Sequence, residues 1–504
     1  MATRTEKVPP LPEEVFGTTK PMYVHGPSEE EEAASEAMEA WLDVKYPRET
    51  KRGLHKRWRI LVDLERLVND WVHSVIPEQQ GRMGARVLTF GSFRLGVINQ
   101  SSDIDTLVML PTQIPRERFF MEFPAVLRAK EEVTECNAVP DARVPVVKVK
   151  YMDIYLDILA ARVPDKYLDP QLDSLDDQLI YYVEEKCMKS MNGVRVADKI
   201  LSLVPDPATF RTATRMIKFW AQQRCIYSNA IGYVGGVSWA LMVGKVCQLY
   251  PYLTAKQIVD RFFYTYDSWN WKANTPVMLG PILDWKTPSF AANKASQYKE
   301  WNPKYPSDKA QPMPIITPIF PTHNTAYNIT HTQKDIIIQE IRRGKEILEL
   351  MHLTRNMDGD AQVTWDDLCC PFPFFESFQR FLLLEIGAEN ETLLLKFKGL
   401  VESRIRALIK GLEDIGIIAR PHTDFFRKDD VSGEFFLGLA AMESGDYDLA
   451  PIVQTFYQET MEKSLQNPEW TAIAGNQIAL VIRSVTADQL SSHIEPKAKR
   501  MRVE

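Results

Sequence analysis

The sequence predicts a mixed α/β protein with several domains. With 504 residues, the chain is too long for one ordinary hydrophobic core and suggests two or three. Short β-prone runs come first, at 87–90, 104–110, 144–149 and 154–160, and helical patterns dominate from 179 to about 249. Beyond residue 378 strand-like and helical runs alternate again, at 381–386, 400–412, 435–441 and 452–464. This second alternation indicates a separate small α+β domain.

The N-terminal elements follow from local patterns. Residues 1–27 are polar and proline-rich, which predicts a flexible lead. Ser28 followed by Glu31 has capping-box spacing at the start of an acidic helix. Apolar residues recur at helical spacing over 57–75, from Trp58 to Trp71, and we interpret this stripe as core packing.

The middle of the chain alternates between regular and irregular segments. The β-prone runs 144–149 and 154–160 meet near Met152, and their spacing predicts a hairpin. Residues 270–312 are rich in Pro, Trp, Asn and Lys without a clear period, so they are predicted to be irregular. A helix is expected over 332–351.

Composition and charge exclude several classes of function. A net charge of −7 and a pI near 5.8 argue against a large basic surface, so any RNA contact must come from local patches or a narrow channel. The six cysteines form no C-x-x-C pair and the histidines no H-E-x-x-H motif, so zinc and disulfide frameworks are not expected. No run is long enough for a membrane span, and the first residues carry no apolar secretory segment.

Three aspartates carry the chemical prediction. Asp103 and Asp105 are two apart on a predicted strand, so they project from the same face, while Ile104 points to the core. Asp157 is polar on an otherwise apolar strand, where an unpaired buried carboxylate is costly. Carboxylates held this close repel one another, and a hard divalent cation removes that cost. The set therefore predicts two ions, Mg²⁺ or Mn²⁺, arranged for nucleotidyl transfer.

A glycine–serine pair lies upstream of the aspartates. Gly91 lets the backbone pass close to a phosphate, and Ser92 adds a hydroxyl donor. A Gly-Ser pair alone usually marks a turn, and an isolated D-x-D is often a solvated loop. Their order, with ten residues between Ser92 and Asp103 and a later strand aspartate at Asp157, favours a catalytic site.

In these features the sequence resembles the nucleotidyltransferase superfamily and, more closely, the eukaryotic nuclear poly(A) polymerases. The resemblance covers about residues 20–490. The stretches that carry it are FGSFRLGV at 90–97, SMNGVRV at 190–196, IKFWA at 217–221, IYSN at 226–229, GGVSWA at 235–240 and MPIITP at 313–318.

The resemblance implies roles for individual residues. Asp103, Asp105 and Asp157 match the family's metal-binding and catalytic triad. The positions that match the ATP-binding residues, besides the triad, are Phe90, Gly91, Ser92, Asn99, Ile104, Lys218, Tyr227, Asn229, Gly236 and Val237. Those that match positions near the RNA and the active-site cleft are Asn192, Thr317 and Asn328. An ordinary turn or cap asparagine is the alternative for Asn192, Asn229 and Asn328, and a solvated helix face is the alternative for Lys218.

The sequence departs from the family pattern at four places. Ser101-Ser102 stand where a Gly-Ala pair is usual, and Asn99 where a Ser or Thr is common. The segment around 280–300 is longer than expected. Arg483 is the one basic residue of 482–490, where relatives carry a basic cluster, which weakens the expectation of RNA contact there.

The resemblance also implies an organisation and a function. The expected parts are a flexible lead (1–19), a catalytic palm with a mixed sheet (20–204), a helical central domain (205–352), an RRM-like RNA-binding domain (353–490) and a basic tail (491–504). The expected activity is template-independent poly(A) synthesis, which transfers AMP from ATP to RNA 3′ ends and releases pyrophosphate. The expected partners are RNA, ATP and 3′-end processing or tethering proteins, in the nucleus and without a membrane. The tail, with Lys497, Lys499, Arg500 and Arg502, has the composition of a nuclear localisation signal or of a solubilising tail.

Three rival functions share part of this pattern. A terminal uridylyltransferase has the same triad and differs in its base pocket. An enzyme that nucleotidylates a small molecule or a protein has no use for an RRM-like domain. A catalytically inactive RNA-binding subunit has no need of clustered carboxylates. The three-domain length and the PIITP stretch at 314–318 favour adenylate transfer over uridylate transfer.

Overall fold

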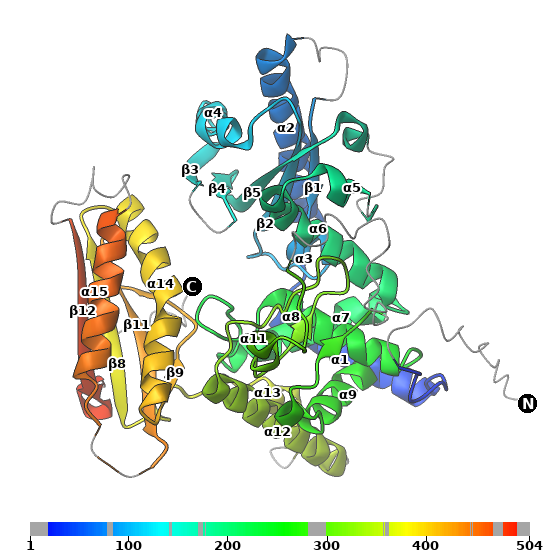
Figure 1. Ribbon diagram of the computed structural model, residues 1–504. Helices are drawn as coiled ribbons and strands as arrows, with labels where there is room; N and C mark the ends of the chain where they lie inside the picture. The colour runs from blue at the N-terminus through cyan, green and yellow to red at the C-terminus, as the bar shows by residue number, and fades with distance from the viewer. Residues whose placement is uncertain are drawn as a thin grey trace, which may run out of the picture.

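The computed structural model describes residues 19–77, 84–140, 144–169, 175–176, 178–280, 299–355, 357, 362–443, 445, 447–466 and 477–490. Its elements form three parts, which we call the palm (51–204), the central part (α1 together with 205–368) and the C-terminal part (369–490) (Figure 1). Most of the predicted lead, the whole basic tail and residues 281–298 lie outside the described residues. Mixed α/β architecture is thereby confirmed.

The palm is built on a five-stranded sheet in the order β1-β2-β5-β4-β3. β2 and β5 pair in parallel and the other neighbours pair antiparallel. The strands are β1 (Arg86–Thr89), β2 (Ile104–Pro111), β3 (Val133–Val139), β4 (Val146–Tyr151) and β5 (Ile154–Val163). The predicted hairpin is confirmed as β4 and β5, joined at Met152 and Asp153. Both turn residues have positive φ, 48° and 61°, as a tight two-residue hairpin turn requires.

Helices cover both faces of the palm sheet. Ile104 and Val108 of β2 point into a core shared with α2 (Lys51–Val75) and α4 (Arg116–Arg128). Leu107 and Met109 point the other way, into a core shared with α6 (Glu185–Leu203). The remaining palm elements are α3 (Gly91–Leu95), η2 (Asp165–Leu168) and α5 (Leu179–Tyr182). The alternation places Asp105 on the α6 side of the sheet.

The predicted helix over 57–75 is confirmed but begins earlier, at Lys51, because the Thr50 hydroxyl accepts from Gly53 N and caps the first turn. The interpretation of the whole apolar stripe as core was wrong at two positions. Trp58 and Val62 are 55% and 65% exposed. They lie four residues apart on the outer side of α2, whereas Leu64 and Val68 face the sheet.

The central part is helical and has an aromatic core. Trp220, Trp239, Phe262 and Phe263 are fully buried and contact one another edge to face or tilted. The helices are α7 (Pro207–Gln223), α8 (Gly236–Leu249), α9 (Ala255–Asp267) and α12 (His331–Thr354), with the short α11 (Pro306–Lys309) and α13 (Trp365–Leu368). The described portions of the predicted irregular segment 270–312 hold only short elements: α11, η3 (Trp271–Ala273) and β6 (Val277–Met278), which pairs with β7 (Ile315–Ile316).

The N-terminal helix α1 (Glu29–Lys45) lies with the central part although it precedes the palm in sequence (Figure 1). Its buried Met38 and Leu42 belong to the core of the central helices. The predicted capping box is confirmed, because the Ser28 hydroxyl accepts from Glu31 N and the Glu31 carboxylate accepts from Ser28 N.

The C-terminal part is an antiparallel sheet backed by two helices. Its strands are β8 (Arg380–Ala388), β9 (Ile417–Pro421), β10 (Phe426–Arg427), β11 (Ser432–Ala441) and β12 (Ile478–Thr486). The order is β10-β11-β8-β12, with β9 also pairing with β11. The helices α14 (Glu391–Asp414) and α15 (Ala450–Gln466) cover one face. A cluster of phenylalanines that includes Phe374, Phe381 and Phe436 covers the other.

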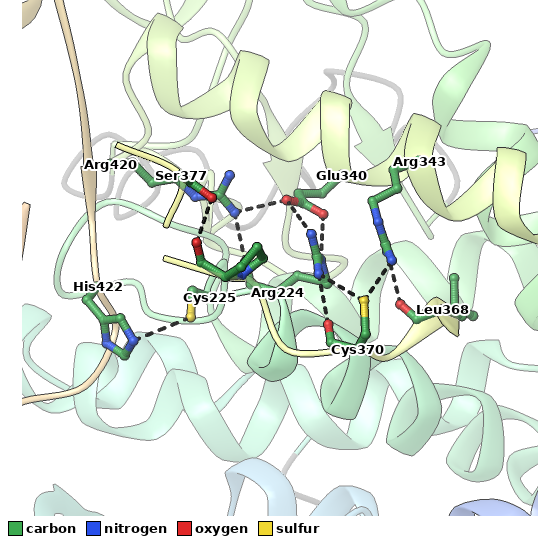
Figure 2. A network of polar contacts seen from close by, with 10 residues as sticks. Arg224, Cys225, Glu340, Arg343, Leu368, Cys370, Ser377, Arg420 and His422 are labelled. Carbon is green, nitrogen blue, oxygen red and sulfur yellow. Dashed lines mark hydrogen bonds and ion pairs between the residues drawn. The ribbon is translucent and has the colours of Figure 1, made fainter. Parts of the chain in front are cut away.

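A buried polar network joins the central and C-terminal parts, as Figure 2 shows. Glu340 of α12 accepts from Arg224 Nε at 2.8 Å and from Arg420 Nη2 at 3.0 Å. The three side chains are 5–9% exposed. Arg224 also donates to the Cys370 carbonyl at 2.8 Å, and Arg420 donates to the Arg224 carbonyl at 2.9 Å. Such a buried arrangement is costly to break from one side, because a charge would be left unpaired.

Among the helices that the structure describes, none is both long and apolar enough to cross a bilayer.

Candidate active site

The aspartates meet at the start of two parallel strands. Asp105 on β2 and Asp157 on β5 are direct register partners, so their side chains leave neighbouring strands on the same face. Asp103 precedes β2 by one residue and is exposed. Ile104 is fully buried on the opposite face of the sheet. The strand alternation inferred for Asp103, Ile104 and Asp105 is confirmed.

The carboxylates make an electrostatically unfavourable group without a cation. Burial, and then the charges of Asp103 and Asp157, raise the pKa of Asp105 to about 7. Burial also raises the pKa of Asp157, and the Lys148 ammonium, 3.6 Å from Asp157 Oδ2, opposes that increase. The three aspartates therefore carry more negative charge than Lys148 offsets.

The donor set fits a hard divalent cation. Carboxylate oxygens are the ligands that Mg²⁺ and Mn²⁺ prefer, and a bound cation removes the repulsion that raises the pKa of Asp105. Across the residues that the structure describes, no three His, Cys, Asp or Glu side chains converge closely enough to form a ready-made metal cage.

The Phe90-Gly91-Ser92 segment closes against the aspartates. Gly91 has φ +61°, and a Cβ added there would lie 2.1 Å from Asp105 Oδ2. A side chain at position 91 would therefore displace the carboxylate, which explains the glycine on steric grounds as well as conformational ones. The Phe90 N–H donates to the Asp105 carbonyl at 3.0 Å and fixes the segment to β2.

The central part brings a lysine, Lys218, close to the carboxylates. Burial lowers the pKa of Lys218 on α7, and the charges of Asp103 and Asp105 oppose that decrease. The Lys218 ammonium lies 5.9 Å from the centroid of the Tyr227 ring. Gly236 opens α8, where an added Cβ would lie 2.5 Å from the Tyr227 hydroxyl. The lysine is half-buried and lines the cavity, so the solvated-face alternative for Lys218 does not hold.

One cavity of about 1740 Å³ brings together most of the predicted residues. The predicted residues that line it are Phe90, Gly91, Ser92, Asn99, Asp103, Asp105, Asp157, Asn192, Lys218, Tyr227, Gly236, Val237 and Thr317. Ile104, Asn229 and Asn328 are not among the lining residues. The Asn328 amide donates to Asn229 Oδ1 at 3.0 Å, so these two asparagines bond to each other.

The cavity has a third wall that the sequence did not reveal. The C-terminal part lines it with residues of α14 and α15, among them Thr392, Lys396, Lys398, Ser403 and Lys463. The palm adds Lys148 and Lys150 from β4, and the central loop adds His323. In sequence these lysines occupy ordinary helical or strand positions, which is also the pattern of a solvated face. Only the packing of three parts around one space identifies them.

Comparisons with known proteins agree along most of the chain. Family models match residues 17–204 (poly(A) polymerase nucleotidyltransferase domain), 209–368 (poly(A) polymerase central domain) and 373–433 (poly(A) polymerase predicted RNA binding domain). Poly(A) polymerase pla1 of Schizosaccharomyces pombe is 38% identical over 414 residues, which are 81% of this chain and 70% of pla1. The chain belongs to the poly(A) polymerase family.

Further relatives show how far the likeness extends. Poly(A) polymerase PAPalpha of Candida albicans is 36% identical over 86% of this chain and 76% of its own length. Nuclear poly(A) polymerase 1 of Arabidopsis thaliana is 34% identical over 88% of this chain and 62% of its own length. Among solved structures, the Cid1 poly(U) polymerase matches with a TM-score of 0.44 and 14% identity, over 68% of this chain and 100% of that one. That likeness is too loose to bear on the choice of base.

Family membership settles the class of reaction. This poly(A) polymerase is a polynucleotide adenylyltransferase that adds adenylates to RNA 3′ ends without a template. The resemblance drawn from the sequence motifs is thereby confirmed, and adenylate transfer is better supported than uridylate transfer.

Proposed function

We propose that the cavity joins ATP to an RNA 3′ hydroxyl with two divalent ions, Mg²⁺ or Mn²⁺, held by Asp103, Asp105 and Asp157. The observation that carries the proposal is the register of Asp105 with Asp157 on parallel strands, facing the Lys218 ammonium across one cavity. When bound, such ions acidify the attacking hydroxyl and neutralise charge on the leaving group.

The chain's own residues position the reactants. Lys218, a compact cation, neutralises the triphosphate, and the Tyr227 hydroxyl lies beside the start of α8 where it orients the nucleotide. The Phe90-Gly91-Ser92 segment brings backbone and a hydroxyl against the phosphates. The 3′ oxygen attacks the α-phosphorus, the bond to the β-phosphate oxygen breaks, and pyrophosphate leaves. Positioning and charge complementarity supply the rate, and no covalent enzyme intermediate forms.

The remaining predicted residues surround these reactants. Gly236 and Val237 form the part of the cavity assigned to the ribose and base, and Asn229, assigned to the same part, accepts a hydrogen bond from Asn328. Asn99 lines the cavity near the nucleotide. Asn192 and Thr317 contribute the cleft side assigned to RNA. The division of the chain at 19, 204, 352 and 490 into lead, palm, central domain, RRM-like domain and tail is part of the same proposal.

We also propose that the enzyme polyadenylates mRNA in the nucleus together with 3′-end processing or tethering proteins. The Arabidopsis relative carries "nuclear" in its name, and the basic tail has the composition of a localisation signal. Deletion of residues 495–504 tests the tail. Unchanged nuclear accumulation of a fluorescent fusion would assign the tail no role in import.

One extension assay tests the core of the proposal. Purified protein is incubated with Mg²⁺ or Mn²⁺, an oligo(A) primer and each nucleoside triphosphate separately. We expect extension with ATP far above that with UTP, CTP or GTP, whereas comparable extension with UTP would favour the uridylyltransferase alternative.

A matched pair of variants tests the metal ligands. Asp157→Asn should abolish extension, because the amide offers one weaker oxygen ligand in place of a carboxylate. Asp153→Asn, four residues earlier in the same hairpin and 83% exposed at its side chain, should retain activity. Substantial activity in Asp157→Asn at saturating ATP and metal would show that Asp157 is not a ligand.

A further inference from the structure

A loop of the central part crosses to the palm at the rim of the cavity. The 317–323 loop (Thr317–His323) lies between β7 and α12, and its two ends are tied together. The Thr317 N–H donates to the His323 carbonyl, and the His323 N–H donates to the Thr317 hydroxyl, each at 3.0 Å. The loop is therefore a closed unit that holds the His323 ring in a defined place.

Two contacts connect this loop to the palm. The first is apolar, because Phe320 packs against the palm core on the α6 side of the sheet, where Phe90 also packs. The second is polar and lies among the cavity-lining residues, where Asn192 of α6 faces His323 with 3.2 Å between Nδ2 and Nδ1. Residues from the two separately matched family segments, 17–204 and 209–368, thus meet at the substrate space.

The polar contact pairs an amide with an imidazole nitrogen. With the Asn192 amide nitrogen as the donor, His323 Nδ1 accepts, and this pairing requires the tautomer that carries its proton on Nε2. The Thr317 hydroxyl, 3.4 Å from the same nitrogen, is placed to donate as well. Asn192 Oδ1 is buried and has no hydrogen-bond partner among the described residues. The contact with His323 therefore ties the Asn192 side chain to the central part within the cavity.

The distance between the palm and the central part determines whether ATP can contact both. The carboxylates belong to the palm, whereas Lys218 and Tyr227 belong to the central part, and one nucleotide must contact both. Lys218 is close enough to Asp103 and Asp105 for their charges to interact. If the two parts separate, the ammonium moves away from the carboxylates, beside which their bound ions would hold the triphosphate.

We propose that His323 is a positioning residue, which latches the central part to the palm through Asn192 and so keeps the two halves of the ATP site at binding distance. The inference rests on the proposed function of the cavity. His323 acts through Asn192 and does not contact the reacting atoms.

The test separates ATP binding from turnover. In His323→Ala, the KM for ATP at saturating oligo(A) should rise about three- to tenfold, the effect expected from one neutral hydrogen bond, while kcat changes little. His323→Asn should restore most of the lost affinity, because its amide oxygen offers an acceptor near the position of Nδ1. In an Asn192→Ala background, His323→Ala should add almost nothing, because the bond is already gone.

The controls distinguish the latch from other causes. His331→Ala, at an exposed position in the first turn of α12, should match the wild type in every measurement. A merely structural role of His323 would lower the unfolding temperature and kcat at an unchanged KM, which would refute the proposal. Equal effects of His323→Ala with and without Asn192 would also refute it. If the wild-type protein fails to extend oligo(A) with ATP, the proposed function itself fails, whatever the variants do.

Discussion

Replacing Asp105 with asparagine should stabilise the metal-free enzyme. Burial and the neighbouring carboxylates raise the pKa of Asp105 from 3.8 to about 7, so the folded state holds a proton that the unfolded chain releases near pH 4. The difference of about 3 pH units, at 1.36 kcal/mol each, corresponds to roughly 4 kcal/mol. The free energy of unfolding therefore falls as pH rises from about 4 to about 7, and the full cost is present above pH 7.

The asparagine carries no charge and should escape this cost. At pH 8 with EDTA we expect the variant to gain about 2–4 kcal/mol of unfolding free energy over the wild type, because part of the cost reflects burial that an amide also pays. At pH 4 the two proteins should be nearly equal. Added Mg²⁺ should stabilise the wild type and leave the variant almost unchanged.

Urea unfolding followed by tryptophan fluorescence measures both proteins at both pH values, and Asp153→Asn serves as the charge-matched control. A gain of equal size at pH 4 and pH 8, or a loss at pH 8, would show that repulsion among the carboxylates does not govern the metal-free site.

Three further predictions concern other features of the molecule. Gly91→Ala should lower kcat about 10²-fold with the fold retained, because the new methyl group displaces the Asp105 carboxylate; extension assays and circular dichroism check the two halves of this statement. Glu340→Ala should lower the unfolding free energy by about 3–5 kcal/mol, since Arg224 and Arg420 would stay buried without their anion. With a net charge of −7, primer binding should have a shallow salt dependence, because the slope of log affinity against log salt falls by about 0.7 for every phosphate contact that is absent. Extension should also be distributive, with one or a few adenylates added per encounter. Long tails made in the presence of excess unlabelled trap RNA would contradict the last expectation.

The elements that the sequence predicted are those with a clear apolar run or with apolar residues at helical spacing. β1, β2, the β4–β5 hairpin, α12, β8, β11 and α15 all appear close to their expected ranges. Several elements were not anticipated, among them α4, β3 and β12. α4 contains Pro124, β3 has no clean alternation of burial, and β12 is half-exposed along most of its length. α14 begins at Glu391 instead of 400, because Asn390 caps its first turn and the buried Leu393, Leu394 and Phe397 continue the apolar face toward the N-terminus.

The candidate site also has one part that the sequence predicted and one part that it did not. Carboxylate chemistry can be inferred from order and spacing alone, since a strand fixes which side chains share a face, and Asp105 does lie opposite Asp157. The third wall could not be inferred, because a lysine such as Lys396 on a helix has the same sequence signature whether it faces water or a cavity. Glu340 shows the same limit, since only the tertiary structure brings two arginines to it from distant segments.

The junction at Glu340 has a consequence for exchanging parts between relatives. Arg224 and Glu340 belong to one matched segment and Arg420 to another, and the Arg420 guanidinium also lies 3.5 Å from the centroid of the Phe372 ring, on the connection between them. A chimera that takes its RNA-binding part from another polymerase would replace Arg420 while keeping Glu340, and so could leave Glu340 without one of its two arginine partners. In a stable chimera, Arg224, Glu340 and Arg420 must therefore be exchanged as a set. The boundary between the two matched segments is for this reason a poor place to join parts of different polymerases.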